Sequence, residues 1–191
     1  MSDADHLRRL LLERSVRHGD FVLASGQRSP YYIDCRLTTM SAEGQVLIGR
    51  MGLAAIRSAG WRPRAIGGLT MGADPVAYAI AAASSGTDLV IDAFSVRKEP
   101  KAHGTGKLIE GNFRSGEEVV VVEDVITSGG SAQQAISAVE GAGGRVVGVL
   151  GVVDREQGGK KALESDGILV VCLTTTSNLG VSISGLPSAD L

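Results

Sequence analysis

Residues 119–131 read VVVVEDVITSGGS and carry the strongest strand signal of the chain. Four consecutive valines lack the alternation of a half-buried strand, so they predict a strand that is covered on both faces. The strand is expected to end at two carboxylates, Glu123 and Asp124, followed by a turn of small residues and a helix over 131–142. A buried strand, a tight turn and a helix form the unit from which parallel α/β sheets are built.

The same alternation of strand and helix is expected along most of the chain. Ser41 is well placed to cap a helix that stops at Gly60, and Asp74 to cap another with Pro75 in its first turn. Further strands are expected at 21–23, 31–35, 64–69, 89–96, 118–122, 146–153 and 168–173, and helices at 7–16, 41–59 and 74–83. We therefore predict an α/β fold with a central, mostly parallel sheet flanked by helices, and a single domain over residues 1–191.

Composition limits the classes of partner. The 191 residues carry a formal net charge of −2, which gives no general attraction to nucleic acid or to an anionic membrane, so neither is expected as a partner. No apolar run approaches the roughly 20 residues that span a bilayer, and the first residues lack the apolar core of a signal peptide. Cys35 and Cys172 are expected to be reduced packing residues, and the protein to be cytoplasmic.

The turn after the valine strand has the composition of an anion site. Residues 127–130, TSGG, turn successive backbone N–H groups toward one point, and the start of the next helix adds positive potential there. Glu123 and Asp124 would repel a phosphate unless they had another partner, and vicinal sugar hydroxyls are a natural one. The run therefore indicates a phosphorylated sugar, since it fits neither a Walker loop nor a dinucleotide fingerprint. The alternative is a tight turn beside a solvated acidic pair.

This run resembles the phosphoribosyl pyrophosphate (PRPP) signature of the type I phosphoribosyltransferases: an apolar strand, two acidic residues, two apolar residues and a Thr/Ser/Gly turn. The resemblance implies the fold of that family. It also implies that the following residues bind the ribose and the 5-phosphate of PRPP: Glu123, Asp124, Val125, Ile126, Thr127, Ser128, Gly129, Gly130 and Ser131.

Residues 95–106, SVRKEPKAHGTG, gather cations and a histidine in a glycine-flanked loop. Such a loop suits a departing pyrophosphate, because cations aimed at a leaving group stabilise the transition state more than the ground state. A solvated charged loop is the alternative. The spacing is similar to the catalytic loop of the orotate phosphoribosyltransferases, which implies that Arg97, Lys98, Lys101 and His103 contact PRPP at its pyrophosphate and act in catalysis, Lys101 foremost. In that family the loop reaches the neighbouring subunit, which implies a homodimer with shared sites.

Residues 21–34, FVLASGQRSPYYID, resemble the N-terminal hood of the same enzymes. The hood is expected to comprise residues 1–40, approximately, and part of the C-terminal tail. The resemblance implies that Ser25 and Gly26 meet orotate and that Tyr31 and Tyr32 offer aromatic faces to it. The alternative is that the two tyrosines are core or interface residues.

Residues 154–158, DREQG, follow another expected strand and match a further segment of that family. Orotate carries a carboxylate, and a guanidinium binds a carboxylate through two parallel hydrogen bonds, which favours Arg155 as its partner. Thr127 is implied as a second orotate contact. The alternative is that Arg155 pairs with Asp154 or Glu156 at the surface.

Together these features predict transfer of ribose 5-phosphate from PRPP to orotate, which gives orotidine 5′-phosphate and pyrophosphate in pyrimidine (UMP) biosynthesis. Mg²⁺ is expected as cofactor, because it prefers phosphate oxygens, although the sequence shows no dedicated cluster of metal ligands. Two departures from the family leave the contacts to substrate open: Ala24 replaces a hood lysine, and residues 68–75, GLTMGADP, lack a lysine that some members carry. The rival functions are a purine or xanthine phosphoribosyltransferase and a non-catalytic regulator that senses PRPP.

Overall fold

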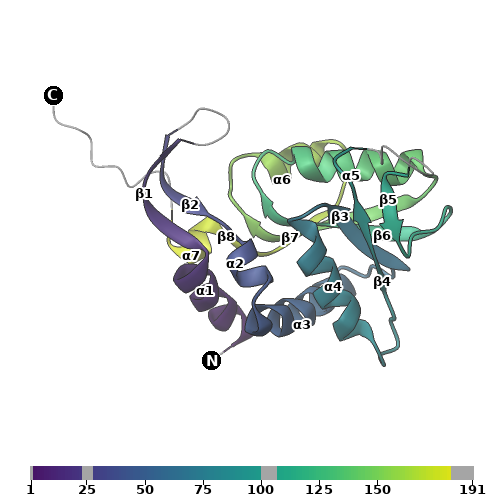
Figure 1. The fold of residues 1–191 in the computed structure, drawn as a ribbon, viewed down its shortest axis with the longest axis horizontal. Coiled ribbons are helices and arrows are strands. Elements are labelled where there is room, and N and C mark those ends of the chain that lie inside the picture. The colour runs from purple at the N-terminus through teal and green to yellow at the C-terminus, as the bar shows by residue number, and fades with distance from the viewer. Residues whose placement is uncertain (1, 23–27, 100–106, 182–191) are drawn as a thin grey trace.

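The computed structural model of the chain describes residues 2–22, 28–99 and 107–181. Its centre is a six-stranded sheet in the order β5-β4-β3-β6-β7-β8, in which only the β4–β5 pair is antiparallel (Figure 1). The strands are β3 (Ala65–Leu69), β4 (Asp92–Val96), β5 (Ile109–Gly111), β6 (Glu118–Ile126), β7 (Arg145–Asp154) and β8 (Val170–Thr175). The predicted α/β class with a mostly parallel sheet is confirmed.

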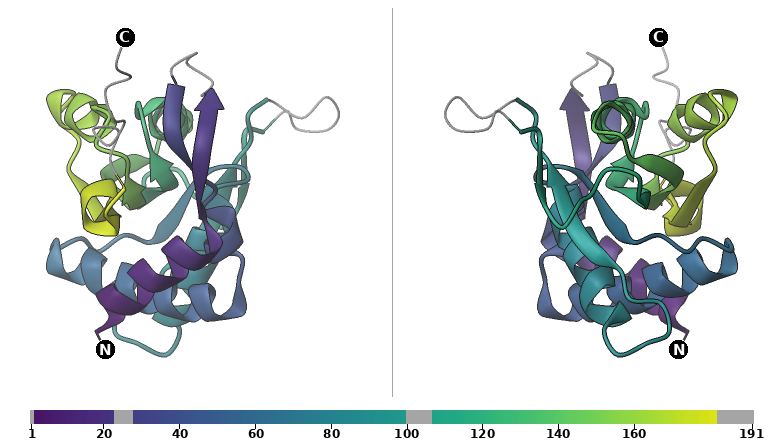
Figure 2. Two further views of the ribbon diagram at one scale, coloured as in Figure 1. Left: turned by 90° about the vertical axis from the view of Figure 1, so that its left-hand side faces the viewer. Right: turned by 90° about the vertical axis from the view of Figure 1, so that its right-hand side faces the viewer.

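Helices cover both faces of this sheet, as the side views make plain (Figure 2). One face packs against α3 (Ala42–Ser58) and α4 (Ala73–Ser84), and the other against α5 (Gly130–Gly141) and α6 (Gly159–Ser165). The valines of β6 divide between the two cores, since successive side chains of a strand point to opposite faces. Val120 and Val122 belong to the core under α3 and α4, whereas Val119 and Val121 belong to the core under α5.

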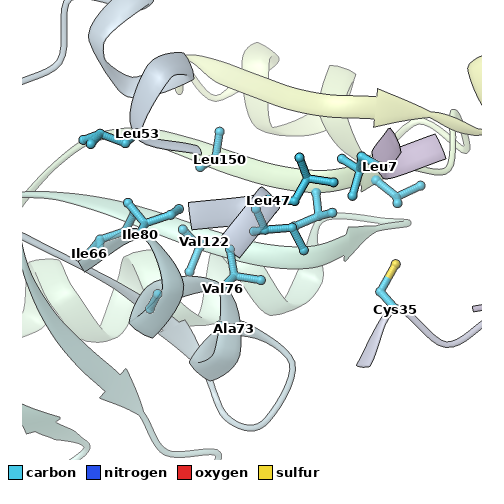
Figure 3. Packing of buried hydrophobic residues seen from close by; sticks show 14 of the residues in the cluster. Leu7, Cys35, Leu47, Leu53, Ile66, Ala73, Val76, Ile80, Val122 and Leu150 are labelled. Carbon is cyan, nitrogen blue, oxygen red and sulfur yellow. The ribbon is translucent and has the colours of Figure 1, made fainter. Parts of the chain in front are cut away.

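The core under α3 and α4 includes side chains from the first and last helices of the described residues. Figure 3 shows part of it, with Val122 of β6 and Leu150 of β7 near Leu47 of α3, and Leu7 of α1 (Asp3–Arg14) at its margin. Helix α1 begins with a capping box, in which Ser2 and Asp5 satisfy each other's backbone N–H groups. It is fastened to the short helix α7 (Thr176–Leu179), because Arg8 Nε donates to the carbonyl oxygen of Asn178 at 2.8 Å.

The hood, defined here as α1, α7, the antiparallel ribbon β1–β2 and α2, stands over one end of the sheet (Figure 1). The ribbon consists of β1 (Val16–Val22) and β2 (Arg28–Ile33), and α2 covers Arg36–Thr39. None of the helices in the described ranges combines the length and the apolar composition needed to cross a membrane. Cys35, buried, and Cys172, half-buried, are both free thiols.

Several boundaries differ from those expected. The Ser41 cap is confirmed, since its Oγ accepts from the N–H of Gly44, but the Asp74 cap is wrong. Helix α4 starts one residue earlier, with Gly72 at its N-cap, and the Asp74 carboxylate instead accepts from Ser95 Oγ at 2.6 Å. Val16 begins a strand rather than ending a helix.

Strand β6 is longer than expected and runs through Glu123 and Asp124 to Ile126. The acidic pair therefore lies inside the last part of the strand rather than after it. Residues 89–91 precede β4, and Cys35 lies between β2 and α2 rather than in a strand. Four short elements were not predicted, namely α2, β5, α6 and α7.

Candidate active site

The site lies at the carboxyl ends of β3 and β6, which are neighbours in the sheet. Strand β3 leads through α4 to β4 on one side, and β6 leads through α5 to β7 on the other side. Connections that leave in opposite directions open a crevice beyond the strand ends, where open α/β sheets bind ligands. A cavity of about 550 Å³ occupies this place. Eight residues predicted from the sequence line it: Tyr32, Lys98, Glu123, Asp124, Val125, Thr127, Ser131 and Arg155.

A larger hollow of about 760 Å³ lies between the outer sides of α3 and α4. Its lining is mostly apolar, and its two arginines are already engaged: Arg50 pairs with Asp3 and Arg57 with Asp88. The smaller cavity is the better candidate for chemistry, because acidic and basic side chains converge there from separate elements.

Both residues of the acidic pair line the cavity, with Glu123 buried and Asp124 half-buried. Glu123 is 8% exposed. Burial, together with the neighbouring charge of Asp124, raises the pKa of Glu123 to about 8. Burial also raises the pKa of Asp124, although its Oδ1 accepts from the N–H of Val125 at 3.0 Å. Glu123 therefore holds a proton at neutral pH in the free protein.

The turn after β3 approaches this pair closely. A Cβ built on Gly72 would lie 2.5 Å from Asp124 Oδ1, so only glycine fits there without displacing the carboxylate. Residues 68–75 thus reach the same cavity as the acidic pair, with Leu69, Thr70 and Met71 on its wall.

The turn after β6 encloses a second, smaller hollow of about 90 Å³. Residues of the predicted signature surround it: Glu123, Val125, Ile126, Thr127, Ser128, Gly129, Gly130 and Ser131. Gly129 has φ +84° and precedes α5 as its N-cap, with no side chain capping the helix. The first N–H groups of α5 are thus available to an anion.

Only part of the basic loop falls in the described residues. Lys98 lines the cavity, and its carbonyl oxygen accepts from Gln134 of α5. Arg97 is turned to the neighbouring strand, where its Nε lies 3.1 Å from Glu110 Oε1. Lys101 and His103 lie outside the described residues, as do Ser25 and Gly26 of the hood.

Arg155 is the most informative residue of the site. It follows β7, is 7% exposed, and lines the cavity. Its Nε and Nη2 are buried and have no hydrogen-bond partner among the residues that the structure describes. Neither Asp154 nor Glu156 forms a salt bridge with it in that part of the chain, so the surface pairing weighed above does not occur there. A buried guanidinium without an acceptor is costly and implies an anion that binds there.

The two tyrosines of β2 have different surroundings. Tyr31 is 2% exposed, and the guanidinium carbon of Arg155 lies 5.4 Å from the centre of its ring. Its face therefore supports Arg155 rather than the cavity. Tyr32 is 40% exposed, lines the cavity, and packs near Phe21 with ring centres 5.7 Å apart.

One charged pair of the site was not predicted. Arg36 binds Asp34 through two hydrogen bonds of 2.8 and 2.9 Å, and both residues line the cavity. These hydrogen bonds lower the pKa of Asp34. The signal in the sequence is weak, because an Asp-x-Arg spacing at the end of a strand has many uses. Within the described ranges, no group of three or more His, Cys, Asp or Glu side chains is arranged to hold a metal ion.

Comparison with known proteins gives consistent matches. Residues 42–181 match the phosphoribosyl transferase domain. The orotate phosphoribosyltransferase of Rhodopirellula baltica is 43% identical over 176 residues, covering 90% of this chain and 91% of that protein. The orotate phosphoribosyltransferase of Aquifex aeolicus is 44% identical and covers 94% of this chain and 98% of that protein. The crystal structure of the Mycobacterium tuberculosis orotate phosphoribosyltransferase in complex with PRPP aligns with a TM-score of 0.78 at 40% identity, over 94% of this chain and 100% of that one.

Proposed function

The chain belongs to the orotate phosphoribosyltransferases, within the phosphoribosyl transferase domain family, and from that premise we propose how its residues carry out the reaction. The enzyme transfers ribose 5-phosphate from PRPP to orotate and releases pyrophosphate, a step of pyrimidine biosynthesis. In the transfer a ring nitrogen of orotate loses its proton to water and forms a bond to the anomeric carbon of ribose. The bond between that carbon and the pyrophosphate oxygen breaks, and its electron pair leaves with pyrophosphate.

Arg155 is proposed to bind the carboxylate of orotate, and this single residue carries the choice of base. Its buried, unpaired nitrogens lack an acceptor that a carboxylate would supply through two parallel hydrogen bonds. Purines carry no such group, and a purine in this cavity would leave the guanidinium unpaired. Tyr32 and Thr127 line the same cavity and are proposed to contact the orotate ring, together with Ser25 and Gly26 of the hood.

The acidic pair and the turn after it are proposed to bind the ribose 5-phosphate of PRPP. Glu123 and Asp124 face the cavity, where they can accept from vicinal ribose hydroxyls. The hollow around residues 123–131 and the uncapped start of α5 suit the 5-phosphate, because backbone N–H groups and the helix dipole both favour an anion there.

The departing pyrophosphate is proposed to be stabilised by Arg97, Lys98, Lys101 and His103. Lys98 already lines the cavity. Arg97 is paired with Glu110, so its charge reaches the leaving group only if that pair opens. We assign the largest catalytic effect to Lys101. A lysine ammonium carries a full positive charge, and if the loop holds it in place, no reorganisation is needed as negative charge develops on the leaving group.

Mg²⁺ is proposed as the cofactor, and the acidic residues of the cavity can supply part of its coordination shell. The cavity offers carboxylate oxygens at Glu123 and Asp124, which are hard ligands, but no complete protein cage within the described residues. Most ligands of the ion would therefore come from PRPP and water. When bound, Mg²⁺ would neutralise charge on the diphosphate.

We propose that the enzyme is a cytoplasmic homodimer with shared active sites. The apolar side chains of Leu37, Met40 and Met71 are 44%, 49% and 59% exposed and line one hollow beside the cavity. An exposed apolar group of this kind at the rim of a site suits contact with a second copy.

We further propose that the hood and the sheet form one domain, because Leu7 of α1 and Leu150 of β7 share a core.

The reaction is tested by the loss of orotate absorbance on addition of PRPP and Mg²⁺, with purine and xanthine bases as comparison substrates. Turnover of orotate alone supports the proposal. Turnover of a purine, or salt-dependent binding of nucleic acid without turnover, would favour one of the rival functions.

The shared sites are tested by mixing Lys101→Ala subunits with Arg155→Ala subunits. If the loop acts on the neighbouring site, each mixed dimer regains one intact site, and the mixture recovers about one quarter of wild-type activity after random exchange. No recovery after verified exchange would place the loop over the cavity of its own subunit.

A further inference from the structure

Glu156, the residue after Arg155, ties the end of β7 to the C-terminal helix. Its Oε2 accepts from the N–H of Ser177 at 2.6 Å and lies 2.8 Å from Thr176 Oγ1. Both partners belong to α7, which is itself attached to α1 through Arg8 and Asn178. The carboxylate thus links the base site to the hood from outside the cavity, since Glu156 is not among the residues that line it.

The backbone at this point is unusual. Glu156 has φ +56° and is the only non-glycine residue with positive φ in the described residues. A side chain in the left-handed region is disfavoured, because its Cβ crowds the following carbonyl oxygen, so local contacts must hold the turn. Two are present: the N–H of Glu156 donates to Asp154 Oδ1 at 2.8 Å, and the carboxylate binds α7.

The same contacts fix the backbone of Arg155. Its N–H donates to the carbonyl oxygen of Ile126 at 2.9 Å. Its carbonyl oxygen lies 3.1 Å from Thr176 Oγ1, whose single proton is shared between this oxygen and Glu156 Oε2. With Tyr31 beneath the guanidinium, Arg155 is held by β6, α7 and the ribbon without using its own Nε or Nη2.

We propose that Glu156 is a positioning residue for orotate, which clamps the turn after β7 onto Thr176 and Ser177 so that the Arg155 guanidinium points into the cavity already oriented. The inference rests on the proposed role of Arg155. Orientation in advance favours binding, because the side chain loses less freedom when the carboxylate arrives. The clamp also gives the C-terminal segment a part in the choice of base.

The test uses three substitutions in the full-length enzyme. Glu156→Gln keeps the shape and removes the charge, whereas Glu156→Gly allows the positive φ without strain and removes the side chain. Thr176→Val removes the shared hydroxyl. Glu156→Gly and Thr176→Val should each raise the KM for orotate about five- to tenfold, as expected for coupled neighbours, and change the KM for PRPP and kcat by less than about twofold. Glu156→Gln should raise the KM for orotate less, because its amide oxygen still accepts hydrogen bonds but without the charge. Thr176→Ser, which keeps the hydroxyl, should behave as wild type, and Glu164→Gln on α6 is the matched control for loss of a carboxylate.

The decisive measurement combines each Glu156 substitution with Arg155→Ala. If Glu156 acts through Arg155, it has no further effect on kcat/KM for orotate once the guanidinium is gone. An equal loss in both backgrounds, or a wild-type KM in Glu156→Gly and Glu156→Gln, overturns the inference while leaving Arg155 as the orotate residue. If Arg155→Ala alone leaves the KM for orotate unchanged, the proposed role of Arg155 fails and the inference fails with it.

Discussion

Replacement of Glu123 by glutamine should stabilise the free enzyme at neutral and alkaline pH. In the folded protein burial raises the pKa of Glu123 to about 8, against an ordinary value of 4.5. Between these two values the folded state holds a proton that the unfolded chain has lost. Because the folded state then binds more protons, the free energy of unfolding falls as pH rises through this window. Glutamine has no such proton and removes this contribution.

The size of the effect follows from the width of the window. About 3.5 pH units, at about 1.4 kcal/mol for each unit, set a ceiling of about 5 kcal/mol above pH 8. Relaxation of the side chain and entry of water reduce this figure, so we expect a gain of about 2 to 3 kcal/mol at pH 9. Below pH 4.5 both states hold the proton, and Glu123→Gln should match the wild type.

The assay is urea unfolding at pH 5, 7 and 9 without substrates or metal, with Glu140→Gln on the exposed side of α5 as the control for loss of one carboxylate. The difference between Glu123→Gln and wild type should grow with pH. A difference that is constant across this range, or that shrinks toward pH 9, would mean that Glu123 is ionised and compensated in the folded state, and the physical account of the acidic pair would be wrong.

Three further substitutions test the packing. Gly148→Ala should lower the free energy of unfolding by about 1 to 3 kcal/mol in urea titrations, because its Cβ would overlap the buried ring of Trp61. Gly72→Ala should raise the KM for PRPP severalfold with little change in unfolding, because the new methyl group meets Asp124 Oδ1; an unchanged KM would separate this turn from the PRPP site. Leu10→Ala should cost about 2 to 4 kcal/mol, since Leu10 is buried in the core shared by the hood and the sheet; two separate unfolding transitions would contradict the single domain.

The central strands of the sheet were predictable because their amino-acid composition alone indicates buried strands. Val119 to Val122 read as a doubly covered strand, and that pattern holds whichever helices cover it. The missed elements are short. Strand β5 has three residues and helix α6 has seven, so neither is long enough for a hydrophobic period to repeat. Only tertiary contacts establish these two elements. The wrong cap at Asp74 has a similar origin, since Ser95, which its carboxylate binds, lies 21 positions further along the chain.

The site was predictable in kind but not in detail. The sequence predicted that Tyr31 and Tyr32 both offer aromatic faces to orotate, but adjacent residues of a strand point to opposite faces, and only Tyr32 lines the cavity. That depends on which face of the ribbon packs against the sheet, and the ribbon turns Tyr31 inward beneath Arg155. Arg97 shows the same limit, because its partner Glu110 comes from a strand that the pattern did not reveal.

The charged groups of the cavity are arranged so that their hydrogen-bond partners come from the substrates. The carboxylates come from β6, and the buried guanidinium comes from the end of β7, and neither group satisfies the other in the described residues. Were Arg155 paired with Glu123 or Asp124, each would lower the cost of burying the other, and little affinity would remain for orotate or ribose. The register of the sheet sets Glu123 opposite Gly151, before β7 reaches Arg155, and Tyr31 and the contacts of α7 hold Arg155 aside. Among the described residues the cavity therefore holds a guanidinium that lacks an acceptor and carboxyl groups that can still accept hydrogen bonds. A base that carries a carboxylate, together with a sugar that carries hydroxyls, supplies both partners.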